Sequence, residues 1–209
     1  MIVYGSSLSP YVRKTLAVAA EKGIEVESRA SREPEPAFLA ASPFRKIPAM
    51  VDGDFSICDS SAIIAYFEAI KPEPAMIPAE AKDRARVVWY EEFADTILVA
   101  AATPMFLNRI VKPRFMGLPG DEAAAAKCEA EDTPRVLDYL ETIVPEAGGF
   151  LVGDRLTLAD LSVASPFANL EYLKFDLSRW PRTKAWTDSI LARPSFAPLL
   201  VRERAMMAA

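Results

Sequence analysis

The spacing of apolar residues changes near residue 71 of this 209-residue chain, and this change limits the folds open to it. Before that point, short strand-like apolar runs alternate with runs of helical spacing, and after it nearly every run is helical. The segment between, KPEPAMIPA, holds three prolines and cannot continue a helix. We therefore predict an α/β domain over residues 1–71, a linker over 72–79 and an all-helical domain over 80–209.

The order of elements in the first part predicts a small mixed sheet. Residues 2–4 and 24–28 read as strands on either side of a helix over residues 10–22. Two strands joined through a helix form a parallel pair. The pair Asp52-Gly53 stands between two apolar runs and predicts a hairpin, and a helix follows from Asp59.

The second part predicts a helical bundle. Residues 80–112 read as one long helix bent at Pro104, and residues 121–144 as a second helix. Thr157 and Asp160 have the spacing of a capping box, in which each side chain accepts from the backbone amide of the other residue at the start of a helix. We expect that helix to run to about residue 173, with a further helix beyond it.

The chain contains no histidine, which excludes Ser-His-Asp and Cys-His catalytic arrangements and histidine-ligated metal sites. The two cysteines, Cys58 and Cys128, form no CxxC pair, so a zinc cluster and a dithiol redox motif are excluded as well. We expect no metal. So few cysteines favour a reducing compartment, and we expect a cytoplasmic location.

Charge and hydropathy argue against two classes of partner. The net charge is −5, from 24 basic and 29 acidic residues, which disfavours nucleic acid. The longest nearly apolar stretch, Ile97 to Leu107, is far shorter than the ~18 residues typical of a membrane span. The first residues, MIVYGSS, lack the basic start and apolar run of a signal peptide. We expect neither a nucleic-acid nor a membrane partner.

Ser9 stands directly before Pro10 at the start of the first predicted helix. A serine there most often caps the helix by accepting from a free amide. It can also face a bound anion, because a helix N-terminus carries partial positive charge and free N–H groups. Without a histidine to act as base, this serine is a poor nucleophile and a better hydrogen-bond donor.

Two further segments have both a structural and a functional interpretation. The proline of Ile47-Pro48 is either a turn device or the second half of a cis bond that frees the Ile47 backbone to pair with a bound peptide. Asp59 and Ser60 either cap the next helix or bind the charged groups of an amino acid. Together with Ser9, these segments suit a short, thiol-bearing, γ-linked peptide.

Three motifs carry a resemblance to a known family: YGSSLSPYVRK, FRKIPAMVDGDFSICDSSAI and GGFLVGDRLTLADLSVA. With them, the chain resembles a cytosolic glutathione S-transferase over essentially its full length. The resemblance implies a thioredoxin-like N-terminal domain followed by an all-helical C-terminal domain, and a homodimer.

The resemblance assigns Ser9 the role of hydrogen-bonding the sulfur of glutathione, as in the serine-type classes (theta-, phi-, tau- and nu-like). Other classes use a tyrosine at the end of the first strand, and Tyr4 lies near that place, so Tyr4 is a second candidate. Classes that use a cysteine form mixed disulfides. Position 9 is serine and Cys58 lies in or beside the hairpin, so we do not expect that chemistry.

The resemblance also implies a binding site for glutathione as co-substrate. Lys46 matches a residue that contacts the glycyl carboxylate, and Ile47, before a cis Pro48, matches one whose backbone pairs with the cysteinyl unit. Asp59 and Ser60 match the pair that binds the γ-glutamyl group, although many relatives have Glu at the first of these positions. The spacing of twelve residues from Pro48 to Ser60 matches the family's spacing from the cis-proline to the glutamyl-binding serine.

The second substrate implied is a small hydrophobic electrophile. From the expected topology, its pocket is lined by Leu8, Tyr11, Phe106 and Arg109, although residues at such spacing are more often core. Conjugation, isomerase, dehalogenase, lyase and peroxidase activities all fit. The alternative function is that of a non-catalytic protein of the same fold that acts as an interaction or regulatory module.

Overall fold

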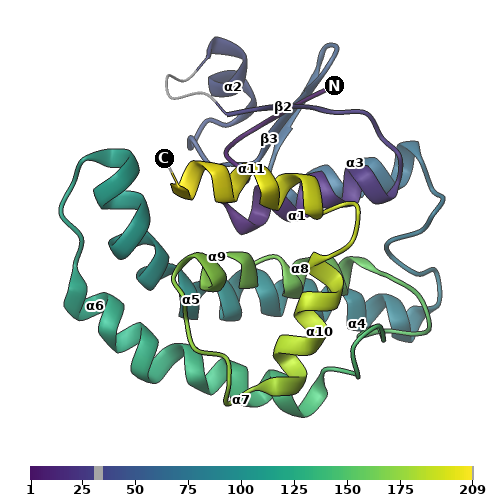
Figure 1. Cartoon of the computed structure of the whole chain (residues 1–209). Helices are drawn as coiled ribbons and strands as arrows, with labels where there is room; N and C mark the ends of the chain where they lie inside the picture. Colours follow the sequence, from purple (N-terminus) through teal and green to yellow (C-terminus); the bar gives the residue numbers. More distant parts are fainter. Residues whose placement is uncertain (31–34, 209) are drawn as a thin grey trace. The chain divides into compact units, whose positions relative to one another are not determined.

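The computed structural model describes residues 1–30 and 35–208, in two compact units (Figure 1). The first unit comprises residues 1–79 and 193–209, and the second comprises residues 80–192. This division differs from the predicted one at two places: residues 72–79, predicted as a linker, belong to the first unit, and so do residues 193–209. The prediction put residues 193–209 in the helical domain, whereas their contacts assign them to the first unit.

The first unit contains a four-stranded sheet with the order β2-β1-β3-β4. As predicted, β1 and β2 are parallel, with Ile2 opposite Glu27, and β3 and β4 form an antiparallel hairpin. Strand β3 runs antiparallel to β1. In chain order the elements are β1 (Ile2–Tyr4), α1 (Pro10–Glu21), β2 (Glu27–Arg29), α2 (Pro36–Ala41), β3 (Ala49–Asp52), β4 (Phe55–Cys58), α3 (Ser60–Ile70) and α11 (Ala197–Ala208).

Helix α1 forms where its ends and apolar face predict it, whereas α11 was not predicted. Helix α1 has Pro10 at its first position and ends before Gly23, whose φ of 60° is the left-handed conformation that glycine adopts at low cost. Its Val12 and Leu16 are buried, and α1 packs beside α3. On α2, Ala41 packs with Tyr4 against the sheet.

The second unit begins with an uninterrupted helical run over residues 81–116. Pro104 lies inside this run without ending it. The run is long and apolar enough to cross a membrane by length and composition alone, and 44% of its most apolar window is buried inside the structure. The run consists of α4 (Ala81–Glu92), the π-helical η1 (Phe93–Leu98), α5 (Val99–Phe106) and the π-helical η2 (Leu107–Met116).

The rest of the second unit is helical, as predicted. A second run, over residues 122–143, ends close to the predicted position. The capping box is present: the Thr157 amide donates to Asp160 Oδ2 at 2.8 Å, and Asp160 also accepts from the Leu151 amide at 2.7 Å. The elements are α6 (Glu122–Lys127), η3 (Cys128–Asp132), α7 (Thr133–Ile143), α8 (Leu158–Ala164), α9 (Phe167–Tyr172) and α10 (Pro181–Leu191).

Candidate functional site

Ser9 occupies the N-cap position of α1 with extended backbone angles (φ −73°, ψ 126°). Its carbonyl accepts the first hydrogen bond of the helix, from the Arg13 amide at 2.9 Å. Its hydroxyl makes no capping hydrogen bond to the described residues of the helix. The structure therefore does not support the prediction that the Ser9 side chain caps the helix. A half-buried hydroxyl remains at a helix N-terminus, where it can donate to an anion.

Tyr4, the second candidate, faces a different part of the first unit. Its side chain is buried, with 3% exposed, and its ring lies 5.9 Å from that of Phe38 on α2. The Arg29 guanidinium lies 5.7 Å from the Tyr4 ring centre, and the Tyr4 hydroxyl donates to Glu35 Oε2 at 3.5 Å. The Tyr4 hydroxyl already has a carboxylate partner, and this geometry favours Ser9 as the donor to a ligand.

The segment before β3 has the cis peptide bond that the resemblance implied, between Ile47 and Pro48. The side chains of Lys46 and Ile47 are exposed. The buried Ser42 fixes the backbone of this segment. Its hydroxyl accepts from the Lys46 amide and donates to the Lys46 carbonyl, both at 2.8 Å. Ser42 was not found from the sequence, since its partner is a backbone group in a loop with no regular spacing.

Gly5 connects the serine loop to this segment. A side chain at Gly5 would place its Cβ 2.9 Å from Ile47 Cβ and 2.7 Å from Val12 Cγ2, closer than such atoms approach. The φ of Gly5 is +132°, which also disfavours other residues. Glycine is therefore required for the end of β1 to pack against the cis-proline segment.

Asp59 and Ser60 form the third part of the site. The Asp59 amide donates to the Pro48 carbonyl at 3.2 Å, which ties the start of α3 to the cis-proline. Asp59 Oδ1 caps α3 by accepting from the amides of Ser61 (2.9 Å) and Ala62 (3.1 Å). The backbone of Asp59 has a φ of 87°, a conformation that costs a non-glycine residue about 1–3 kcal/mol and is often kept at functional sites.

The capping role of Asp59 leaves part of the pair free to bind a ligand. Both capping bonds use Oδ1, so Oδ2 of the exposed carboxylate can accept from an amino group. Ser60 is the first residue of α3 and is only 3% exposed. Through Gly5 and Asp59, the structure thus brings all three predicted segments together on one unit.

The residues predicted for the second substrate divide between the two units. Leu8 is buried and Tyr11 half-buried in the first unit, while Phe106 is buried in the second. Arg109 is engaged in ion pairs inside the second unit. The pocket that would combine these residues stays a prediction.

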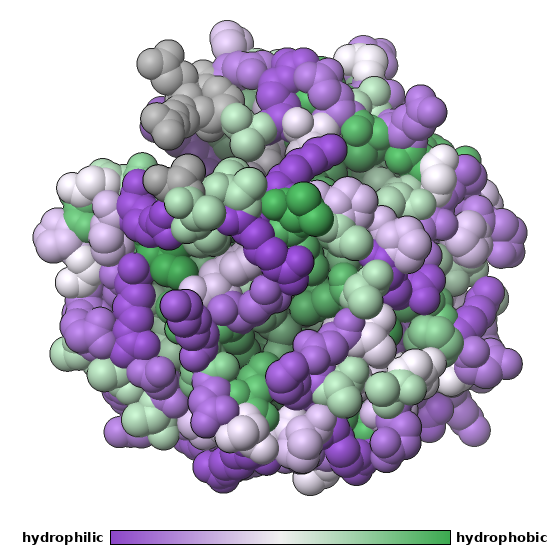
Figure 2. All heavy atoms as spheres, in the orientation of Figure 1, coloured by the Kyte–Doolittle hydropathy of each residue, from purple (hydrophilic) through white to green (hydrophobic). Residues whose placement is uncertain are grey.

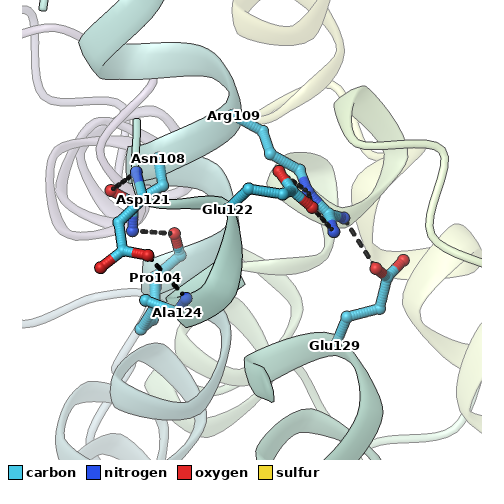
Figure 3. A network of polar contacts seen from close by, with 7 residues as sticks. All are labelled: Pro104, Asn108, Arg109, Asp121, Glu122, Ala124 and Glu129. Carbon is cyan, nitrogen blue, oxygen red and sulfur yellow. Dashed lines mark hydrogen bonds and ion pairs between the residues drawn. The ribbon is translucent and has the colours of Figure 1, made fainter. Parts of the chain in front are cut away.

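The partners of Arg109 are both carboxylates (Figure 3). Its guanidinium donates to Glu122 from Nη2 at 2.6 Å and to Glu129 from Nη1 at 2.8 Å. The hydrogen bond from Arg109 lowers the pKa of Glu122, although partial burial opposes this effect. Arg109 therefore joins η2 to α6 and η3, which is a structural role.

Asn108 makes a second connection in the same region (Figure 3). Its Nδ2 donates to the Pro104 carbonyl at 2.9 Å, and its Oδ1 accepts from the Asp121 amide at 3.0 Å. Asp121 in turn caps α6 by accepting from the Ala124 amide at 2.9 Å. These bonds fix the turn between η2 and α6.

The second unit also has an apolar groove with a volume of about 620 Å³, referred to below as the α4–α7 groove. It is lined by Trp89, Phe93, Ile97, Ala100, Ala101, Asp132, Arg135, Val136 and Tyr139.

Much of the surface in Figure 2 is hydrophilic, with apolar residues exposed in separate groups. Among residues 1–30 and 35–208, no three His, Cys, Asp or Glu side chains are placed to hold a metal ion.

Two protein-family models match the chain. Residues 3–75 match the model described as glutathione S-transferase, N-terminal domain. Residues 108–200 match the model described as glutathione S-transferase, C-terminal domain. The two ranges contain the serine loop, the cis-proline segment, the Asp59-Ser60 pair and the capping box.

Known proteins resemble the chain over most of its length. It is 33% identical over 205 residues to Glutathione S-transferase 3 of Zea mays, covering 93% of this chain and 90% of that relative. It is 35% identical over 163 residues to Elongation factor 1-gamma of Schizosaccharomyces pombe, covering 76% of this chain but 38% of that relative. A solved glutathione S-transferase from Rhodospirillum rubrum F11 superposes with a TM-score of 0.85 at 28% identity, covering 95% of this chain and 90% of that one.

Proposed function

Because the chain belongs to the glutathione S-transferase family, we propose that it activates the thiol of glutathione as a thiolate for attack on a small hydrophobic electrophile. The observation that carries the proposal is the Ser9 hydroxyl, which stands at the N-terminus of α1 without a capping bond to the described helix. Conjugation is the expected outcome of the attack.

The size of the expected effect follows from the chemistry of the thiol. A free cysteine thiol has a pKa near 8.5, and one pKa unit corresponds to about 1.4 kcal/mol. A hydrogen bond to a charged group contributes about 1.5–3 kcal/mol, and a helix N-terminus adds to it. Ser9 and α1 together can therefore lower the pKa of the thiol by about one to two units, so that much of the bound glutathione is thiolate at neutral pH.

The rest of the glutathione molecule suits the residues around Ser9. The exposed Lys46 ammonium would pair with the glycyl carboxylate, and the backbone of Ile47, before the cis Pro48, would pair with the cysteinyl unit. At the start of α3, Ser60 would donate to the γ-glutamyl carboxylate, and Asp59 Oδ2 would accept from its amino group.

The test compares wild type, Ser9→Ala and Tyr4→Phe. Each protein is titrated with glutathione across pH while the ultraviolet absorbance of the thiolate is recorded. We expect a band well below pH 8.5 in wild type and in Tyr4→Phe, and its loss in Ser9→Ala. Each variant removes one hydroxyl, so Tyr4→Phe is a matched control. Loss of the band in Tyr4→Phe with its survival in Ser9→Ala would reverse the assignment.

The wider role that we propose is detoxification in the cytoplasm. The two free cysteines, Cys58 and Cys128, are consistent with a reducing compartment. The electrophile is expected to contact Leu8 and Tyr11, which flank Ser9 in the first unit. A screen of chemically distinct electrophiles with wild type and Ser9→Ala would identify the class of substrate.

A second candidate function is that of a non-catalytic interaction module. The match to Elongation factor 1-gamma favours it, since that relative carries a similar segment within a longer protein. The glutathione titration distinguishes the two functions. Binding with a low-pH thiolate band supports the transferase, whereas no binding of glutathione supports the interaction module.

A further inference from the structure

The last helix, α11, lies along α1 in the first unit (Figure 1). Helix α11 and the segment just before it are joined to α1 near both of its ends. Near its start, Arg13 donates to Glu203 from Nε (3.1 Å to each carboxylate oxygen) and from Nη2 (2.7 Å). At its end, Glu21 accepts from Arg193 (2.8 and 3.1 Å) and from the Ser195 hydroxyl (2.6 Å). The segment that begins at residue 193 therefore runs antiparallel to α1.

The first of these ion pairs is completely buried. The side chains of Arg13 and Glu203 are both 0% exposed. Such a pair is weak evidence for stability, because removing two charges from water is costly and apolar side chains of similar size often serve as well. A guanidinium that shares two hydrogen-bonding nitrogens with one carboxylate does, however, fix the direction of both groups. The pair thus fits a role in orientation better than one in stability.

Arg13 is directly connected to the candidate catalytic residue. Its amide donates to the Ser9 carbonyl at 2.9 Å, so Arg13 closes the first turn of α1. Residues four apart lie on the same face of a helix, one above the other. Holding the Arg13 side chain in one direction therefore restricts the turn that carries Ser9. Glu203 lies beyond the range 108–200 that matches the C-terminal family model.

We propose that Glu203 is a positioning residue, which holds the first turn of α1 through Arg13 so that the Ser9 hydroxyl meets the thiol of bound glutathione. The proposal rests on the function proposed above. A displacement of about 1 Å in a reacting geometry can lower a rate about 100-fold, so a remote clamp of this kind has a measurable effect.

The experiment compares Glu203→Gln with Glu21→Gln. Both variants neutralise a carboxylate that joins α11 or its leading segment to α1, but Glu21 lies at the far end of α1 from Ser9. Glutamine keeps the shape of Glu203 but removes the charge that pairs with the buried Arg13, so the guanidinium is no longer held in one direction by that carboxylate. We measure the apparent pKa of the bound thiol from its thiolate absorbance, together with kcat and KM for glutathione.

In Glu203→Gln we expect the pKa of the bound thiol to rise by about one unit, with kcat at neutral pH about three- to eightfold lower. KM for glutathione should change less than twofold, because Lys46 and Ser60 are untouched. Glu21→Gln should leave the thiol pKa at its wild-type value. An unchanged thiol pKa in Glu203→Gln would overturn the proposal. So would a lower thiol pKa, which would mean that Arg13 acts on the thiol only as a nearby positive charge.

A second variant keeps the test decisive if Glu203→Gln does not fold. The double variant Arg13→Met/Glu203→Leu replaces the pair by apolar side chains, which often restores folding. We expect the double variant to fold and to keep the raised thiol pKa, because apolar packing alone does not hold the first turn of α1 in one direction. A wild-type thiol pKa in the double variant would overturn the proposal. Absence of the thiolate band in wild type itself would instead refute the proposed function, and this role of Glu203 with it.

Discussion

At the scale of single residues, Asp160 shows how a buried carboxylate is tolerated. It is fully buried, and its oxygens accept from the amides of Leu151 and Thr157 and from the Thr157 hydroxyl at 3.2 Å. Burial raises the pKa of Asp160 to about 6, while these hydrogen bonds favour the charged form and oppose the rise. The capping box therefore holds a group that titrates in the mildly acidic range.

The raised pKa predicts a pH dependence of stability. Because folding raises the pKa of Asp160 from 3.8 to about 6, its contribution to stability is fully present below pH 4 and is lost as pH rises through about 6. Urea unfolding of wild type and Asp160→Asn between pH 4 and 7 measures this. We expect the stability of wild type relative to the variant to fall across that range.

The control for this prediction is Asp188→Asn, which removes an exposed carboxylate paired with Lys184 in a helix of the same unit. Its stability relative to wild type should show no comparable slope. If the stability of wild type relative to Asp160→Asn rose between pH 4 and 7, the hydrogen bonds to Asp160 would outweigh its burial. Its pKa in the folded protein would then lie below its pKa in the unfolded chain.

Two local features of the candidate site could be predicted from the sequence, but the residues that hold the site together could not. The cis bond before Pro48 is confirmed, and Asp59 does cap a helix, because local motifs carry both signals. Gly5 and Ser42 were not predicted as parts of the site. Gly5 acts through a contact with a distant segment, and Ser42 through backbone groups of an irregular loop, neither of which leaves a periodic pattern.

At the scale of elements, the proline-rich segment after α3 is more firmly held than its composition suggests. The Glu68 carboxylate accepts from the amides of Met76 (3.1 Å) and Ile77 (3.2 Å) and from the buried Lys22 ammonium. Lys22 also donates to the Pro74 carbonyl at 2.8 Å. The predicted linker is thus fixed to the first unit, to which residues 1–79 belong.

We expect Glu68→Ala to release this segment. Two backbone amides and one ammonium lose their shared acceptor, so local opening becomes easier and proteases gain access. Digestion with a protease of broad specificity, followed by mass analysis of the fragments, should show faster cleavage within residues 71–79. Glu73→Ala is the control, since within the described part of the chain its carboxylate accepts only from the nearby Ala75 amide, at 3.3 Å. Equal cleavage rates in the two variants would contradict the role of Glu68.

At the scale of the whole molecule, the division into units was only partly predictable. Helical spacing identifies a helix but not the surface on which it packs, so residues 193–209 were assigned with the preceding helices. Their partners lie far back in the chain: Glu21 and Arg193 are 172 positions apart, and Arg13 and Glu203 are 190 apart. The predicted thioredoxin-like and helical parts are otherwise confirmed by the strand order and the helices.

A homodimer is the remaining prediction at this scale. We expect light scattering at micromolar concentration to give twice the mass of one chain. The α4–α7 groove supports this, since it exposes apolar side chains such as Trp89 (49% exposed). Trp89→Glu should give the mass of one chain, because a buried interface disfavours an unpaired charge. Phe115→Glu, at a similarly exposed apolar residue outside the groove (44%), should remain a dimer. A wild type with the mass of one chain would contradict the prediction.

The return of α11 to α1 has a consequence for how the chain is made. Glu203 leaves the ribosome 190 residues after Arg13, which at about 5–20 residues per second is a delay of about 10–40 s. During that time, residues 80–192 can complete their own unit, because they form one continuous stretch. The unit that contains α1 is therefore completed only when the segment that begins at residue 193 has been made, after the unit of residues 80–192.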